Sequence, residues 1–459
     1  MSLRSRLYLW WMKHRPRTLS TTKVIALVFA ALILLGACLL ALPGASRSGV
    51  SCGFRPALFT ATSATCVTGL VLYDTWSQWS GFGQIVILCL IEIGGLGFMS
   101  AATLLIFFFR RRIGLKQRMM MAQALSVSDM GGIVRLQKTV LIGSFAVEAL
   151  GALILTLRFW PEYGFARALR WGVFHAVSAF CNAGFDIFGV LSPGSSLTEF
   201  QSDPVVLLTL GALVVIGGLG FLVWEEIAVT RKFRKFSVYT RLVLITTAGL
   251  LLAGWVLICL LEWNNPNTLG PMPLGDKLLN GLFQSVTLRT AGFAAIDQGL
   301  LTEGAKAVSI VLMIVGGSSG STAGGLKTVT FVVLFLFMAA RARGRDTVCV
   351  FKRTIPQAQV LDAMTIAFIM IALSVFGGIF ISATSAVTFT DGLYEAVSAL
   401  ATVGLTAGVT GNLSIPAQLL MIVYMYFGRV GVLTISLGFL MGNRAEERFC
   451  YAQTSLLIG

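Results

Sequence analysis

Four segments constrain the fold of this chain most, because each lies between two long apolar runs and is too short to cross a bilayer. A membrane-spanning helix needs about 20 predominantly apolar residues. The short segments are 55–65, 167–180, 276–288 and 388–400. The long apolar runs are 24–42, 83–109, 137–157, 205–229, 241–261, 305–340, 360–382 and 415–441. The pattern predicts eight spans in four pairs, with one re-entrant segment inside each pair.

Each short segment ends in a similar phrase. The phrases are ATCVTGL (64–70), AFCNAGF (179–185), TLRTAGF (287–293) and LATVGLT (400–406), which place Gly69, Gly184, Gly292 and Gly404 at nearly equal intervals. The following long runs contain IGGLGF at 93–98 and 216–221, VGGSSG at 315–320 and FGRVGV at 427–432. Close helix packing would explain isolated glycines, but the recurrence of two phrases predicts a fourfold internal repeat.

We therefore expect an all-α polytopic membrane protein. Each repeat would contain a spanning helix, a re-entrant pore helix and a second spanning helix (M1–P–M2), arranged around a pseudo-fourfold pore. The predicted parts are an N-terminal tail (1–23), repeat 1 (24–109), repeat 2 (137–229), repeat 3 (240–340) with an intramembrane loop (316–328), repeat 4 (360–441) and a C-terminal tail (442–459).

The composition and charge pattern agree with a membrane protein. Apolar residues make up 56% of the chain and charged residues 12%, against about 25% charged in soluble domains. The net charge of +15 does not indicate nucleic-acid binding, because the basic residues abut apolar runs and form no separate solvated domain. The basic clusters are Arg4–Lys23, Arg110–Lys138, Arg231–Arg241, Arg341–Arg353 and Arg444. The positive-inside rule places them and both termini in the cytoplasm.

Other features of the sequence exclude several classes of site. The run 24–42 is longer than the h-region of a signal peptide and predicts a retained helix. The eight cysteines are scattered without a C-x-x-C pattern, which favours small core residues. Only two histidines occur, His14 and His175, which excludes a histidine-rich metal site. We find no nucleophile–base pair and no metal-ligand cluster, so we expect no enzyme activity and no cofactor.

The four glycine phrases predict an ion path. A non-helical backbone survives at membrane depth only where it lines water or protein, and inward-facing carbonyl oxygens can replace the hydration shell of K⁺, as in the TVGYG filter. Glycine permits the required backbone angles, and the carbonyl ends of the short helices favour a cation. The predicted filter residues are Val67, Thr68, Gly69, Asn182, Ala183, Gly184, Thr290, Ala291, Gly292, Thr402, Val403 and Gly404.

Charged residues flank the predicted filter. Asp74, Asp186 and Asp297 follow the first three loops and would concentrate cations at the outer mouth, although each alone is equally explained as a solvated loop acid or a helix cap. Arg289 precedes the third phrase, and we expect it to point behind the filter and pair with a pore-helix acid such as Glu395.

These motifs resemble the Trk/Ktr/HKT potassium-transporter superfamily over nearly the whole chain. Because the first repeat starts near Val24, with no preceding helix pair, the chain resembles the shorter KtrB type. The resemblance implies a homodimer on a cytoplasmic ring of RCK subunits that bind ATP or ADP, and in some members cyclic di-AMP. It also implies Na⁺-dependent uptake of K⁺. Members that prefer Na⁺ often carry serine at the first filter position, where this chain has Gly69.

The stretch GGSSGSTAGGLKT (316–328) is close to a phosphate-binding loop, but Leu326 separates the second glycine from Lys327. The flanking runs 304–315 and 329–340 are each too short to span alone, so they predict one broken helix. The stretch would then lie under the filter as a gate. The candidate gate residues are Gly316, Gly317, Ser318, Ser319, Gly320, Ser321, Thr322, Ala323, Gly324, Gly325, Lys327 and Arg429.

Arg429 occupies the equivalent place in the fourth repeat, inside an apolar helix. An intramembrane arginine indicates a functional site, and here it would form a positive barrier and bind carbonyls of the loop. A purely structural anchor remains the alternative. Lys327 would stabilise the loop or extend toward the inner surface.

The sequence thus predicts a K⁺ uptake subunit in the plasma membrane, with K⁺ as the transported ion and Na⁺ as a coupling ion. An alternating-access carrier for another cation or small solute is the alternative, since broken helices occur there too. A membrane NTPase is a third class. The basic segments 110–118, 231–241 and 341–353 would contact an RCK ring or lipid headgroups.

Overall fold

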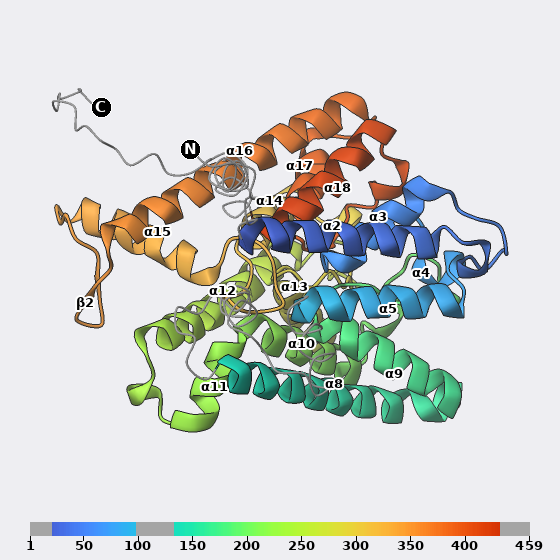
Figure 1. Ribbon diagram of the computed structural model, residues 1–459, viewed down its shortest axis with the longest axis horizontal. Helices are drawn as coiled ribbons and strands as arrows, with labels where there is room; N and C mark the ends of the chain where they lie inside the picture. Colours follow the sequence, from blue (N-terminus) through green and yellow to red (C-terminus); the bar gives the residue numbers. More distant parts are fainter. Residues whose placement is uncertain (1–20, 98–132, 432–459) are drawn as a thin grey trace, which may run out of the picture.

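The computed structural model describes residues 21–97 and 133–431, most of which are helical (Figure 1). The longest helices are α2 (Thr21–Leu40), α8 (Ile133–Tyr163), α12 (Val238–Glu262) and α16 (Gln357–Thr384). All four contain a segment long and apolar enough to cross a membrane. They match the predicted runs 24–42, 137–157, 241–261 and 360–382.

A shorter helix follows each of these long helices and packs directly against it. The four are α3 (Phe54–Thr65), α9 (Phe165–Phe180), α13 (Leu274–Thr287) and α17 (Phe389–Leu400). Their bounds agree with the predicted short segments to within two residues. The last turns of these helices are buried, because their small residues pack into the centre of the bundle.

The helices that follow the loops are short or interrupted. They are α5 (Gly81–Leu96), α10 (Pro204–Leu219) with α11 (Phe221–Thr230), α14 (Glu303–Ile314) with α15 (Thr328–Ala342), and α18 (Ile415–Val430). A polar side chain caps the start of α5, α10, α14 and α18 by accepting from a backbone N–H of the first turn. These caps are Ser80, Asp203, Thr302 and Ser414.

The run 205–229 departs from the predicted straight span. Its two helices, α10 and α11, are bent by 93° at Gly220, whose φ of 92° is accessible mainly to glycine. Gly97 and Gly431 have similar positive φ values at the ends of α5 and α18. The remainder of the predicted runs 83–109 and 415–441, the residues before Thr21, the segment 98–132 and the C-terminal tail lie outside the described residues.

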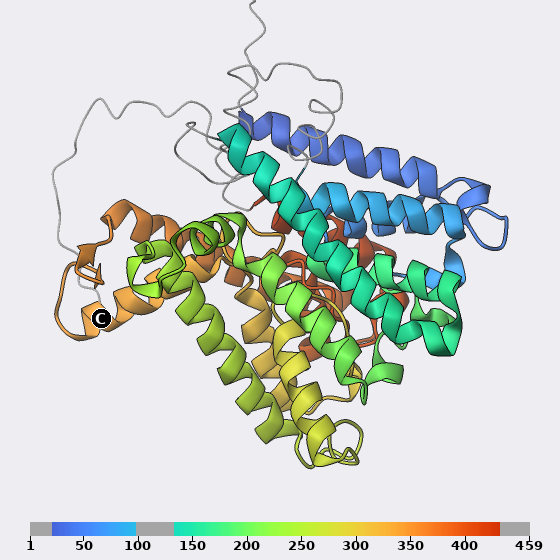
Figure 2. The same cartoon turned by 90° about the horizontal axis from the view of Figure 1, so that it is seen from below.

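The remaining elements are small. They are α4 (Thr75–Gln78), the 3₁₀ turns Pro43–Ala45, Phe188–Val190, Thr198–Phe200, Phe233–Lys235, Gln298–Leu300 and Thr410–Asn412, and the strands β1 (Cys349–Val350) and β2 (Arg353–Thr354). The two strands form an antiparallel hairpin between α15 and α16. Both views show this hairpin projecting from one side of the bundle, together with the ends of α15 and α16 (Figures 1 and 2).

Candidate functional site

The loops after α3, α9, α13 and α17 share one backbone conformation. Their first residues all lie in the left-handed region, with φ between 51° and 61°: Val67, Asn182, Thr290 and Thr402. Their glycines also have positive φ, between 68° and 100°: Gly69, Gly184, Gly292 and Gly404. A left-handed conformation is rare for the β-branched Val and Thr side chains. Backbone strain of this kind concentrates at functional sites.

The four loops meet and form a closed ring. A Cβ atom on Gly69 would lie 2.5 Å from the carbonyl oxygen of Ala183, and one on Gly184 would lie 2.7 Å from that of Ala291. In the same way, a Cβ atom on Gly292 would lie 2.8 Å from the carbonyl oxygen of Val403, and one on Gly404 would overlap the carbonyl oxygen of Thr68. Each glycine thus abuts the middle residue of the next loop, and the fourth returns to the first. The ring leaves no room for a side chain at any of the four glycines.

The short helices hold the loops by their N–H groups. The N–H groups of Thr68, Ala183 and Val403 donate to the carbonyl oxygens of Ser63, Ser178 and Ser398, at 2.7 to 2.8 Å. The hydroxyl groups of Ser63 and Ser398 also accept from the N–H of Gly69 and Gly404, at 3.0 and 3.1 Å. Because a trans peptide directs its N–H and C=O in opposite directions, the carbonyl groups of these peptides point away from the short helices.

Several polar atoms of the loops have no partner. Within residues 21–97 and 133–431, the buried hydroxyl groups of Thr68, Thr290 and Thr402 and the amide nitrogen of Asn182 form no hydrogen bond. Buried polar atoms are usually satisfied, so the hydroxyl oxygens of these three threonines are available to a ligand. A cation is the kind of ligand that hydroxyl and carbonyl oxygens bind.

Glycines of the following helices pack against the carbonyl ends of three short helices. A Cβ atom on Gly94, Gly217 or Gly428 would overlap the carbonyl oxygen of the last residue of α3, α9 or α17. These glycines belong to the recurring phrases IGGLGF and FGRVGV. These three glycines therefore allow the backbone of the following helix to approach the end of the short helix closely, beside the ring.

The segment 315–327 between α14 and α15 folds back on itself. The N–H of Gly316 donates to the carbonyl of Leu326, and the N–H of Leu326 donates to that of Ile314, each at 2.9 Å. These bonds form a parallel bridge between Val315 and Leu326, so the chain between α14 and α15 is not helical.

The same segment lies against the second and fourth loops. The Thr322 hydroxyl lies 3.1 Å from the carbonyl oxygen of Phe180, the last residue of α9, and 2.9 Å from Oδ1 of Asn182. A Cβ atom on Gly324 would overlap the hydroxyl of Thr402 and lie 2.7 Å from the carbonyl oxygen of Ala401. The segment therefore occupies the space next to the ring.

Arg429 in α18 connects this segment to α5. Its Nη1 donates to the carbonyl of Thr322 at 2.5 Å, and its Nη2 donates to the carbonyls of Gly94 and Gly95. The predicted contact between Arg429 and loop carbonyls is thus present. Lys327 donates within the segment, to the carbonyl of Ala323 at 2.8 Å.

The expected pair between Arg289 and Glu395 does not form. Arg289 is 8% exposed and donates through Nη2 to the carbonyl of Gly316 at 2.7 Å. Glu395 is fully buried and accepts from the Thr406 and Thr410 hydroxyls and the N–H of Ala407, at 2.5 to 3.0 Å. The carboxylate is satisfied by the chain that leaves the fourth loop, so Arg289 bonds to segment 315–327 instead.

The three aspartates that follow the loops have different surroundings. Asp74 caps α4 by accepting from the N–H of Ser77 at 2.7 Å, and Asp297 caps a 3₁₀ turn by accepting from the N–H of Gly299 at 2.8 Å. Asp186 is half-buried and accepts from the N–H of Phe188 at 3.2 Å. Burial, together with the nearby Asp74 carboxylate, raises the pKa of Asp186 to about 7.

Sequence reasoning missed several residues of this region. The carbonyls of Gly94 and Gly95 hold Arg429, and the Tyr239 hydroxyl donates to Ser319 O at 2.9 Å. The repeated IGGLGF phrase was a signal for the glycines, although it did not indicate that their carbonyls accept hydrogen bonds. No pattern in the sequence points to Tyr239.

Known proteins resemble this chain over most of its length. The family model TrkH, described as a cation transport protein, matches residues 7–446. The potassium/sodium uptake protein NtpJ of Enterococcus hirae is 40% identical, covering 98% of this chain and 99% of the relative. The Ktr system potassium uptake protein B of Bacillus subtilis is 38% identical, covering 98% of both chains.

A solved structure supports the fold. The crystal structure of the potassium transporter TrkH from Vibrio parahaemolyticus matches with a TM-score of 0.72 and 17% identity, over 93% of this chain and 86% of that chain. The resemblance seen in the sequence is confirmed, and with it the expectation that the chain is not an enzyme. The chain belongs to the TrkH family of cation transport proteins.

Proposed function

We propose that this protein is the ion-translocating subunit of a Ktr-type potassium uptake system. The closed ring of four glycine loops carries the proposal, because it brings the four equivalent positions of the chain to one place. The relatives named as potassium or potassium/sodium uptake proteins support K⁺ as the transported ion. In this proposal each long helix, short helix and following helix forms one M1–P–M2 unit of a pseudo-fourfold pore.

The ring would select K⁺ by replacing its hydration shell. Carbonyl oxygens of the loops, such as those of Thr68 and Val403, would coordinate the ion in turn. The carbonyl ends of the four short helices point toward the same place and favour a cation. The glycines matter because any side chain would occupy the space of a neighbouring carbonyl.

Segment 315–327 and Arg429 would form the gate. The segment contacts the second and fourth loops through Thr322 and Gly324, and Arg429 donates to it from α18. A cation that leaves the ring on this side meets both a packed backbone and a positive charge. Opening would require the segment to leave Asn182 and Thr402.

Further parts of the proposal rest on the family. Both termini would lie in the cytoplasm, with the chain in the plasma membrane, a homodimer as the working form, and a cytoplasmic RCK ring as its regulatory partner. Uptake would depend on Na⁺. The exposed hairpin β1–β2, which contains Arg353, and Arg341 near the end of α15 supply basic surface for such a ring.

Gly69→Ser tests the filter. A side chain at this position is strained at a φ of 100° and its Cβ would lie 2.5 Å from the Ala183 carbonyl oxygen. We expect the preference for K⁺ over Na⁺ to fall by about tenfold, which corresponds to about 1.4 kcal/mol. The measurement is radioactive rubidium uptake into proteoliposomes with K⁺ or Na⁺ as competitor, with and without candidate RCK subunits.

Gly49→Ser is the matched control for that measurement. Gly49 also has a positive φ, of 72°, but an added Cβ meets nothing within 4 Å. Unchanged ion preference in Gly69→Ser would contradict the filter assignment. Uptake of an organic solute in place of rubidium would favour the carrier alternative.

Asp186 predicts a pH dependence at the outer mouth. Because its pKa is raised to about 7, the side chain is neutral below pH 7 and negatively charged above it. We expect the half-saturating K⁺ concentration to fall by about threefold as external pH rises from 6 to 8, since a fixed negative charge concentrates cations. Asp186→Asn should remove this dependence, and Asp297→Asn serves as a comparison. A wild-type profile that is flat in this range would refute the assignment.

A further inference from the structure

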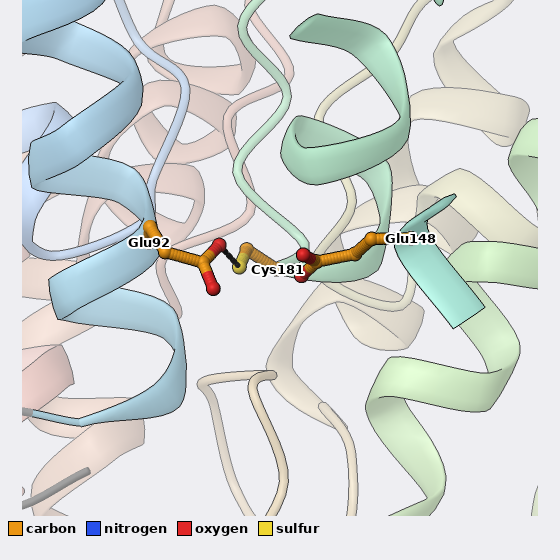
Figure 3. A group of neighbouring side chains, drawn as sticks. All are labelled: Glu92, Glu148 and Cys181. Carbon is orange, nitrogen blue, oxygen red and sulfur yellow. Dashed lines mark hydrogen bonds between the residues drawn. The ribbon is translucent and has the colours of Figure 1, made fainter. Parts of the chain in front are cut away.

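Two glutamates and a cysteine from three different helices meet beside the second loop. Glu92 lies in α5 and Glu148 in α8, and Cys181 is the residue directly after α9 (Figure 3). One ligand atom from each, a carboxylate oxygen or the sulfur, lies within 4.8 Å of the other two. The Cys181 thiol donates to Oε2 of Glu92 at 3.5 Å. The three side chains point toward one another across the space between the helices.

The two carboxylates lack compensation. Glu148 is 4% exposed, and neither its Oε1 nor Oε1 of Glu92 has a hydrogen-bond partner in the described part of the chain. Neither glutamate forms an ion pair with any residue in 21–97 or 133–431. Carboxylates inside a membrane helix bundle are costly unless a partner balances their charge. The charge is balanced either by a proton shared between the two carboxylates or by a positive species between them.

Arg429 is not that species. Its guanidinium lies against the next turn of α5, where it donates to the carbonyls of Gly94 and Gly95, and its remaining bond goes to Thr322. No ion pair joins it to a carboxylate in the described part of the chain.

The ligand atoms decide which cation fits. Thiolate ligands favour Zn²⁺ and similar metals, whereas Na⁺, K⁺ and Mg²⁺ are bound mainly by oxygen. Zn–S bonds are about 2.3 Å and Zn–O bonds about 2.0 to 2.2 Å, so in the tetrahedral geometry of Zn²⁺ the ligand atoms lie about 3.4 to 3.6 Å apart. The 3.5 Å between Sγ of Cys181 and Oε2 of Glu92 matches this spacing. The widest pair, within 4.8 Å, needs a contraction of about 1 Å, which a change in a glutamate side-chain torsion supplies.

We propose that Glu92, Glu148 and Cys181 bind one divalent cation of the Zn²⁺ class between α5, α8 and the second loop. Binding would displace the thiol proton and any proton held by the carboxyl groups. A cleft of about 490 Å³ borders both glutamates and is otherwise lined by apolar side chains and Cys89. It offers room for a water molecule as a fourth ligand.

The location of the site predicts an effect on transport. Cys181 precedes Asn182 of the second loop and packs against Gly95, where an added Cβ would lie 2.5 Å from its sulfur. Gly95 also accepts from Arg429. A bound metal would fix α5 to the second loop and hold Arg429 in place. Provided that the proposed gate exists, Zn²⁺ should lower uptake.

Metal binding by the purified full-length protein tests the site without reference to transport. We expect one Zn²⁺ per chain by titration calorimetry and metal analysis, and a cadmium–thiolate absorption band when Cd²⁺ replaces it. Cys181→Ser and Glu148→Gln should each weaken binding by at least about tenfold, or about 1.4 kcal/mol. Excess Mg²⁺ should not compete. Because the two variants change different helices, misfolding of one leaves the other informative.

Cys66→Ser is the matched control, since Cys66 is the buried residue directly after α3, as Cys181 is after α9. Its binding should equal that of the wild type. The proposal is overturned if the wild type binds no metal, which would leave a shared proton between the glutamates, or if Cys66→Ser weakens binding equally. In proteoliposomes, Zn²⁺ should reduce rubidium uptake by the wild type but not by Cys181→Ser. If the wild type binds metal but Zn²⁺ affects the uptake of the two proteins equally, the metal site stands and its proposed effect on the gate is overturned.

Discussion

Arg429→Ala is expected to raise rubidium uptake into proteoliposomes by about tenfold. Its guanidinium lies next to the ring and binds the segment that contacts it. At an effective dielectric constant of 20, two unit charges about 4 Å apart repel by about 4 kcal/mol, and the repulsion falls in inverse proportion to the distance. A tenfold increase in uptake requires the removal of only about 1.4 kcal/mol of this repulsion. The alanine also frees the carbonyls of Thr322, Gly94 and Gly95 from a common donor, which should loosen segment 315–327.

Two variants separate the charge from the contact. Arg429→Lys keeps the positive charge but cannot reach three carbonyls with the same fork of donors, so it should raise uptake less than alanine does. Arg289→Met removes another buried arginine that binds the segment, at the carbonyl of Gly316, and shows how far loss of a charge and a contact at a second position has the same effect. Deletion of 317–324 should also raise uptake. Reduced uptake by Arg429→Ala at normal protein amounts would assign Arg429 a purely structural role.

The short helices could be predicted from sequence because local rules decide them. A dozen apolar residues cannot span a bilayer, and the glycine of each phrase follows the end of its short helix by four or five residues. Hence the bounds of α3 and α17 were predicted nearly to the residue. The non-helical segment between α14 and α15 could also be predicted, since the polar residues there do not continue the apolar pattern.

Contacts between distant parts of the chain could not be predicted in the same way. Arg429 bonds to Gly94 and Gly95, more than 300 residues earlier, and nothing local specifies that partner. The bend at Gly220 was missed because residues 210–224 are all apolar or glycine, so composition gave no reason to divide the run there. The partner of Arg289 was wrongly expected to be a carboxylate, although a backbone carbonyl satisfies an arginine equally well.

The grouping of Glu92 and Glu148 with Cys181 could not be predicted for a different reason. Each is a single acid within a strongly apolar run, and a search for spans tolerates one such residue. The rule that intramembrane acids indicate functional sites applied to both, but only the structure brings them to Cys181. The sequence contains the ligands, and the packing of α5 against α9 brings two of them together.

Gly404→Ala is expected to abolish uptake, with a loss of at least about a hundredfold, or about 2.7 kcal/mol. Gly404 has a φ of 97°, and an added Cβ would overlap the carbonyl oxygen of Thr68 and lie 3.1 Å from Cα of Gly292. Alanine costs about 1 to 2 kcal/mol in a left-handed conformation. The larger effect comes from displacing the Thr68 carbonyl. Both neighbours, the Thr68 carbonyl and Cα of Gly292, are backbone atoms, so neither can move away by a side-chain rotation.

Gly408→Ala distinguishes strain from loss of the ring. Gly408 lies four residues further along, with a φ of 83°, but an added Cβ there meets nothing within 4 Å. Both variants therefore carry similar backbone strain, and only Gly404→Ala intrudes on a neighbouring loop. We expect Gly408→Ala to retain most of its uptake and both proteins to reach the membrane in equal amounts. Equal uptake by the two variants would mean that the four loops do not form the ion path, since a methyl group in the ring would then be harmless.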